Sequence, residues 1–92
     1  MCGNSTIQAL AEKYCLGNYG PRDVALVKGQ GSYVWDADGK RYLDCFGGIA
    51  VAATGHCHPK VVEAIQQQAE TLIHVSNLYL IEPQARLAEF LC

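Results

Sequence analysis

The 92-residue sequence has no CxxC pair, no basic stripe and no long apolar run. Its five cysteines are odd in number and irregularly spaced, which argues against a disulfide scaffold. Its seven lysines and arginines are scattered over a chain of net charge −2, so neither nucleic-acid binding nor a polybasic membrane anchor is indicated. No apolar stretch approaches the roughly 20 residues that a membrane span needs.

The N-terminal stretch MCGNSTIQAL also lacks the charged and apolar regions of a signal peptide. Reduced thiols and a cytoplasmic location are therefore expected. Half of the residues are hydrophobic and 17% are charged, a composition that argues against a disordered chain and indicates a globular protein.

The first predicted helix covers residues 4–14. Ser5 lies three residues before Gln8, which is the spacing of a capping box. Apolar side chains then recur at helical spacing, which predicts a short helix. They are Ile7, Leu10, Ala11 and Tyr14.

Two further helices are predicted near the C-terminal end of the sequence. Residues 58–73 are amphipathic, and Pro59 suits the first helical position, where its missing N–H costs nothing. Residues 82–92 form the last helix, with Pro83 in its first turn. The side chains expected to face a core are Val61, Val62, Ile65, Ala69, Leu72, Ile73, Leu87, Phe90 and Leu91.

An antiparallel sheet is predicted between the first and second helices. Residues 24–27 form a short apolar strand, and residues 32–36 and 40–44 are β-rich runs on either side of a turn. The turn sequence DADG suits a type I turn closed by Gly39 in the left-handed region. The predicted fold class is therefore α+β, with one short helix, a hairpin or meander, and two helices.

The small apolar stretch FGGIAVAATG, at 46–55, shows neither strand alternation nor helix caps. Because two adjacent glycines weaken either regular state, we expect a buried loop or extended segment that another group approaches closely. A three-stranded meander is thin cover for the apolar helix faces, so the chain is expected to be the N-terminal portion of a larger protein. A complete small α+β domain is the alternative.

The stretch GHCHP, at 55–59, offers candidate ligands and a candidate nucleophile. A structural zinc site needs four ligands, usually in two pairs, whereas His56, Cys57 and His58 crowd one stretch and form at most half a site. A nucleophilic Cys57 needs an orienting carboxylate near its base, and the sequence supplies none. We expect a hinge instead, with Gly55 in the turn, His58 capping the helix and Cys57 buried.

No catalytic residue and no metal site are expected in the chain. None of its four lysines lies in an apolar run that would lower its pKa, so no Schiff-base lysine is indicated. The stretch KGQGSYV contains GxG but lacks the third glycine and the helix of a nucleotide site. In the largely apolar connector at 75–83, Ser76, Asn77 and Tyr79 carry polar groups. Two explanations are open: these side chains stabilise turns and helix ends, or they donate hydrogen bonds to a ligand.

Between about Tyr19 and Cys92, four stretches occur in an order and at a spacing that match those of a known family. They are GQGSYVWDADGKRYLD, GGIAV, GHCHPKVVEAIQQQAETLIHVSNLY and EPQARLAE. Together they resemble the N-terminal region of class III pyridoxal-phosphate aminotransferases, and the acetylornithine subgroup most of all.

The resemblance implies a fold-type I α/β enzyme that is a homodimer and uses pyridoxal 5′-phosphate. Residues 1–18 would be an N-terminal helical segment, 19–56 the antiparallel β segment and pocket loop of the small domain, and 57–92 the helices leading into the large domain. In the family the cofactor lysine lies further along, so this chain alone is expected to be inactive.

The resemblance also implies the reaction and four site residues. The enzyme would transfer an amino group from N-acetylornithine or a related ω-amino donor to 2-oxoglutarate, as in arginine biosynthesis. Tyr19 and Ile49 match substrate-pocket positions, and an aliphatic residue at 49 fits the acetylornithine type better than the ornithine type. Ser76 and Asn77 match a pair near the cofactor site of the partner subunit. The alternative is a non-enzymatic fragment that pairs with a full-length transaminase subunit.

Overall fold

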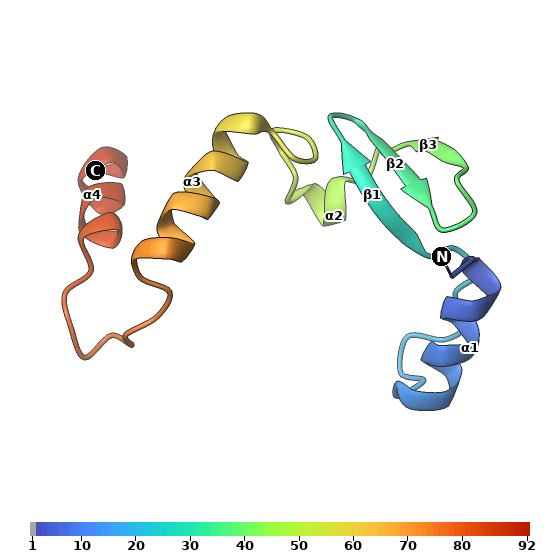
Figure 1. Ribbon diagram of the computed structural model, residues 1–92. Helices are drawn as coiled ribbons and strands as arrows, with labels where there is room; N and C mark the ends of the chain where they lie inside the picture. Colours follow the sequence, from blue (N-terminus) through green and yellow to red (C-terminus); the bar gives the residue numbers. More distant parts are fainter. Residues whose placement is uncertain (1) are drawn as a thin grey trace. The chain divides into compact units, whose positions relative to one another are not determined.

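The computed structural model describes residues 2–92, which form four helical segments and three strands (Figure 1). The helices are α1 (Asn4–Tyr14), α2 (Gly47–Ala50), α3 (Pro59–Thr71) and α4 (Glu82–Leu91), and the strands are β1 (Leu26–Gln30), β2 (Tyr33–Asp36) and β3 (Arg41–Leu43). The chain divides into two compact units, and the division falls between Pro59 and Lys60. The predicted α+β content is confirmed.

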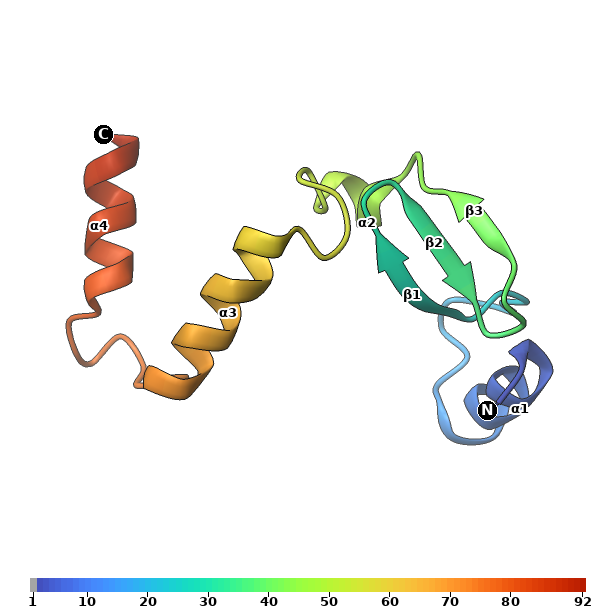
Figure 2. The ribbon, with the colours of Figure 1, turned by 45° about the horizontal axis from the view of Figure 1, so that its top comes forward.

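The three strands form an antiparallel meander in the order β1-β2-β3 (Figure 2). Val34 of the central strand is 7% exposed and lies in the small core. In the turn between β2 and β3, Gly39 has a φ of 86° and donates its N–H to the carbonyl of Asp36 at 3.0 Å. The predicted hairpin and its left-handed glycine are confirmed.

The first strand begins later than predicted. Residues 24–27 were expected to form it, but β1 starts at Leu26 and continues to Gln30, which pairs with Tyr33. Pairing with β2 extends the strand through the polar residues KGQ. At its beginning, the N–H of Ala25 is bound by the Asn4 side chain rather than by a strand.

The predicted capping box is wrong. Helix α1 begins at Asn4, so Ser5 lies inside it, and its N-cap residue, Gly3, makes no side-chain capping bond. The amide of Gln8 instead donates to Glu12. The carboxylate of Asp38, in the hairpin turn, accepts the N–H of Asn4 at 3.1 Å, so an anion from elsewhere in the chain satisfies the helix start.

The carboxylate of Asp36, which is 4% exposed, is the polar centre of the first unit. It accepts hydrogen bonds from the Asn4 amide at 3.1 Å, the Tyr42 hydroxyl at 2.8 Å, and the N–H groups of Asp38 and Lys40. Burial raises the pKa of Asp36, but these four bonds outweigh it and hold the pKa below 3.8. One carboxylate therefore ties α1, the turn and β3 together.

The second unit, which begins at Lys60, consists of α3 and α4 with their connector. As predicted, Pro59 is the first residue of α3, and Pro83 lies in the first turn of α4. The apolar side chains expected to face a core are not buried within residues 2–92, where neither helix has a buried residue. Within the same residues, no helix has the length and hydrophobicity that crossing a membrane requires.

Candidate functional site

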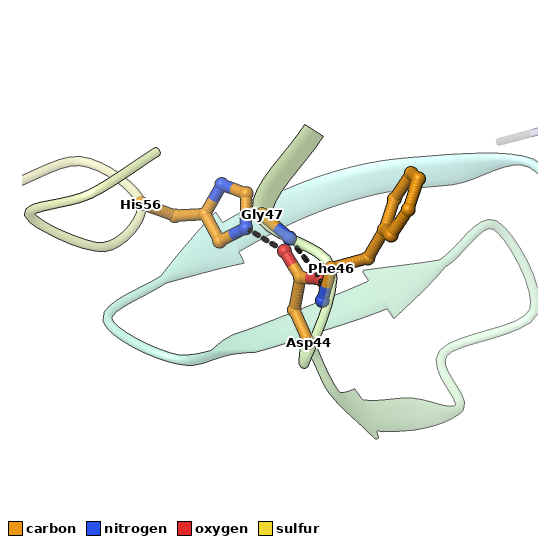
Figure 3. A network of polar contacts seen from close by, with 4 residues as sticks. All are labelled: Asp44, Phe46, Gly47 and His56. Atoms are coloured by element: carbon orange, nitrogen blue, oxygen red, sulfur yellow. Dashed lines mark hydrogen bonds and ion pairs between the residues drawn. The ribbon is translucent and has the colours of Figure 1, made fainter. Parts of the chain in front are cut away.

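The carboxylate of Asp44, which directly follows β3, contacts the backbone of the next residues and the side chain of His56 (Figure 3). Its Oδ1 accepts the N–H of Phe46 at 2.9 Å and of Gly47 at 2.8 Å, and its Oδ2 lies 2.6 Å from Nε2 of His56. The bond from the Gly47 N–H, then the contact with His56, then the bond from Phe46 lower the pKa of Asp44 from 3.8 to about 2. The group is therefore a firmly ionised carboxylate at neutral pH.

His56 is held by β1 and the turn that follows it. Its N–H donates to the carbonyl of Gly31 at 2.8 Å, and its carbonyl accepts the Gly31 N–H at 2.9 Å. A Cβ on Gly29 would lie 2.7 Å from both Cβ and Cγ of His56, so only glycine leaves room for the ring over the strand. The glycines of KGQG thus serve the placement of this histidine.

The segment after Asp44 forms a left-handed helical turn, α2. Its four residues, Gly47–Ala50, have φ values of 57°, 63°, 64° and 61°. The N–H of Ala50 donates to the Phe46 carbonyl at 3.0 Å, and the N–H of Val51 to the Gly47 carbonyl at 2.8 Å. Ile49 and Ala50 are not glycine, and this conformation costs each roughly 1–2 kcal/mol. Such strain persists only where the surroundings hold it, and it concentrates at functional sites.

The expectation of a buried loop or extended segment at 46–55 is wrong, because the stretch contains this exposed turn. Ile49 is 76% exposed within the chain. The expected close approach does occur at Gly55, where a Cβ would lie 3.0 Å from the carbonyl oxygen of Gly31. Cys57 was expected to be buried but is exposed, with a φ of 56°. The bonds to the Asp44 carboxylate determine the conformation of this stretch, and its apolar composition alone could not predict them.

The expectation that no carboxylate orients the histidines of GHCHP is wrong for His56, which Asp44 contacts. The sequence did contain one signal. Asp44 lies two residues before Phe46, at the start of a glycine-rich stretch, which is the arrangement of an Asx turn. Among residues 2–92, no three or more His, Cys, Asp or Glu side chains form a group that could hold a metal ion.

Tyr19 lies in the segment between α1 and β1 and is 78% exposed. The guanidinium of Arg22 lies 5.9 Å from its ring centroid, a cation–π contact. A cavity of about 550 Å³ runs between α1 and residues 15–25, but Tyr19 does not line it. In the described residues, no hydrogen bond or ring contact joins Tyr19 to Ile49.

Ser76 and Asn77 lie in the connector between α3 and α4, and both are exposed. Ser76 has a φ of 65°, which makes it a strained residue like Ile49. Within residues 2–92, neither side chain has a hydrogen-bond partner, so a hydroxyl and an amide group are available as donors. Hydroxyl and amide donors of this kind suit phosphate or carboxylate oxygens. Ile49 and Ser76 belong to different units of the chain.

A family model described as Aminotransferase class-III matches residues 16–92. The chain is 59% identical over 80 residues to acetylornithine aminotransferase from Methanocaldococcus jannaschii, a match that covers 87% of this chain and 20% of that protein. The chain thus spans about a fifth of the length of the curated relatives it matches.

Solved structures of transaminases share the fold. Acetylornithine aminotransferase from Elizabethkingia anophelis superposes with a TM-score of 0.91 and 32% identity, covering 99% of this chain and 24% of that one. Taurine:2-oxoglutarate aminotransferase from Bifidobacterium kashiwanohense, solved with PLP and glutamate, gives a TM-score of 0.85 and 32% identity over 99% of this chain and 21% of that one.

The family predicted from the four sequence stretches is therefore confirmed, and so is the fold class, an α+β segment of a PLP-transferase fold. The left-handed turn, the Asp44–His56 contact and the strained Ser76 all lie within the matched residues. This chain belongs to the class III aminotransferase family.

Proposed function

We propose that this chain is the N-terminal part of a PLP-dependent transaminase that moves an amino group from N-acetylornithine, or a related ω-amino donor, to 2-oxoglutarate. The observation that carries the proposal is the strained left-handed turn that presents Ile49 to solvent, because strain of this kind is retained where function needs it. The proposed setting is a cytoplasmic homodimer of the arginine-biosynthesis type.

Each site residue has a proposed role that its chemistry supports. Ile49 offers an apolar wall and Tyr19 a phenol to the amino donor. The hydroxyl of Ser76 and the amide of Asn77 donate to a phosphate, directed at the site of the partner subunit. When bound, pyridoxal phosphate supplies the electron sink that amino-group transfer requires.

A chimera tests the proposal. Residues 1–92 replace the matching stretch of the M. jannaschii acetylornithine aminotransferase, and transamination between N-acetylornithine and 2-oxoglutarate is measured. We expect turnover comparable to that of the unaltered relative, and we expect the relative without its N-terminal stretch to be inactive. A folded, cofactor-loaded chimera without turnover would contradict the proposal.

We also propose that the isolated chain is inactive. Residues 1–18 would be an N-terminal segment, 19–56 a part of the small domain, and 57–92 the helices that lead into the large domain. Incubation of the pure chain with pyridoxal phosphate should give neither a saturable absorbance band nor turnover. Saturable cofactor binding with turnover would overturn this part.

The exposed apolar side chains of α3 and α4 favour a second candidate, a fragment that pairs with a full-length subunit without catalysis. Ile65, Leu87 and Phe90 are all exposed. Co-expression with the complete relative distinguishes the two candidates. A stable heterodimer that forms while the chimera stays inactive would favour the pairing fragment.

A further inference from the structure

We infer that Asp44 and His56 are positioning residues for the substrate pocket: together they hold the left-handed turn Gly47–Ala50 that presents Ile49. This inference rests on the proposed function, because Ile49 is a pocket residue only in a transaminase of this type. Neither residue is assigned a contact with substrate or cofactor.

The turn needs an external restraint because two of its residues that are not glycine have positive φ. Ile49 and Ala50 both adopt a conformation that disfavours any side chain with a Cβ. Ile49 is largely exposed within the chain, so packing does not fix it. The restraint is found at the start of the turn, where Asp44 Oδ1 accepts the N–H groups of Phe46 and Gly47. These two bonds set the direction in which the turn begins.

His56 provides the second half of the restraint. The loop between Asp44 and His56 is closed by the 2.6 Å contact between Oδ2 and Nε2. His56 cannot follow a moving loop, because its backbone is bonded in both directions to Gly31 and its ring lies against Gly29. The contact therefore fastens the carboxylate, and with it the start of the turn, to the sheet. Figure 3 shows the carboxylate between the imidazole and the two amide nitrogens.

The chemistry of the contact supports positioning rather than proton transfer. All the polar atoms of the Asp44 carboxylate are engaged, one oxygen by two N–H groups and the other by the imidazole. Hydrogen bonds to a charged group are stronger than those between neutral groups, so the contact is well suited to holding a strained segment.

The test uses the chimera described above, with steady-state kinetics for N-acetylornithine and 2-oxoglutarate. We expect His56→Ala to raise KM for N-acetylornithine roughly tenfold, with a smaller change in kcat, since the loss of a charge-assisted bond has about this effect on binding. His56→Gln should retain most of the wild-type KM, because its amide nitrogen can donate to Asp44 from a similar position. A purely structural role would lower the yield of active enzyme and leave KM unchanged.

A second variant tests the turn itself. Glycine adopts positive φ readily, so Ala50→Gly in the His56→Ala background removes part of the strain that the pair normally holds in check. We expect it to recover part of the lost KM. His74→Ala is the matched control, because this histidine is exposed and lies outside the loop; its KM should equal that of the parent.

Failure of this inference differs from failure of the proposed function. An inactive parent chimera contradicts the proposed function. An active parent whose His56→Ala variant keeps the parental KM overturns the positioning role alone. If His56→Ala does not fold, the inference is decided by Ala50→Gly in the His56→Gln background: a KM at or below that of His56→Gln supports it, and a higher KM overturns it.

Discussion

The side-chain amide of Asn4 donates a hydrogen bond to the carboxylate of Asp36, 3.1 Å away and 32 residues further along the chain. The other polar atom of this side chain, Oδ1, accepts the N–H of Ala25 at 3.0 Å and the N–H of Ala37 at 3.3 Å. One short side chain thus joins the start of α1 to the segment before β1 and to the hairpin turn.

Replacing this residue should loosen the N-terminal helix. We expect Asn4→Ala to lower the free energy of unfolding of the chimera by about 1–3 kcal/mol, because three bonds to partly buried groups are lost. Chemical denaturation measures the change, and faster proteolysis within residues 15–25 should accompany it. Ser5→Ala is the control and should leave the free energy of unfolding nearly unchanged. If Ser5→Ala lowers it as much as Asn4→Ala does, Ser5 caps the helix after all.

A methyl group on Gly29 should displace His56. The added Cβ would meet the histidine Cβ and Cγ at 2.7 Å, and neither is the flexible end of a side chain. We expect Gly29→Ala to destabilise the chimera by about 1–3 kcal/mol, the usual cost of overpacking, and to raise KM as His56→Ala does. Gly17→Ala, with no atom within 4 Å of the added carbon, controls for the loss of a glycine. Unchanged stability and KM in Gly29→Ala would contradict the crowding.

Acid should release the Asp44 contact. The pKa of Asp44 is about 2 in the folded chain and 3.8 as its ordinary value, so the folded state favours the ionised form. The resulting stabilisation is complete above pH 3.8 and is lost as the pH falls toward 2. Asp44→Asn should therefore remove part of the acid sensitivity of unfolding in this window, as measured by thermal unfolding at successive pH values.

Asp23→Asn is the control for this measurement, since Asp23 is exposed and accepts no hydrogen bond from residues 2–92. Its unfolding curve should depend on pH as that of the parent does. If Asp44→Asn and the parent lose stability in parallel through the same window, the carboxylate does not carry the proposed restraint.

The residue at 49 should influence the choice of amino donor. We expect Ile49→Tyr in the chimera to raise kcat/KM for ornithine relative to N-acetylornithine, because a phenol fills space next to the donor and offers a hydrogen bond to an uncapped amine. Competition between the two donors gives the ratio directly. Val51→Tyr places the same side chain two residues on and should leave the ratio unchanged. An equal shift of the kcat/KM ratio in both variants would show that Ile49 has no special place in the pocket wall.

Local chemistry in the sequence was enough for several elements. The turn after Asp36 was predictable because only glycine accepts the φ of 86° at position 39 without strain. The starts of α3 and α4 were predictable because Pro59 and Pro83 fit the first helical turn. These features depend on a few neighbouring residues. The family was recognisable for the same reason, because its motifs are short and occur in a fixed order.

Contacts between distant residues decided the rest. The sequence predicts a buried loop or extended segment where the structure has the left-handed turn Gly47–Ala50. Nothing in the sequence around Asp44 or His56 indicates that these two side chains are in contact. Their contact exists only once β1 has paired with β2 and placed Gly31 beside His56. In the same way, the start of α1 is satisfied by Asp38, a residue 34 positions away that the hairpin brings close. The sequence determined which turns and helix starts were possible, and tertiary pairing determined which side chains restrain the strained turn, because that restraint needs partners that the chain brings together only when it folds.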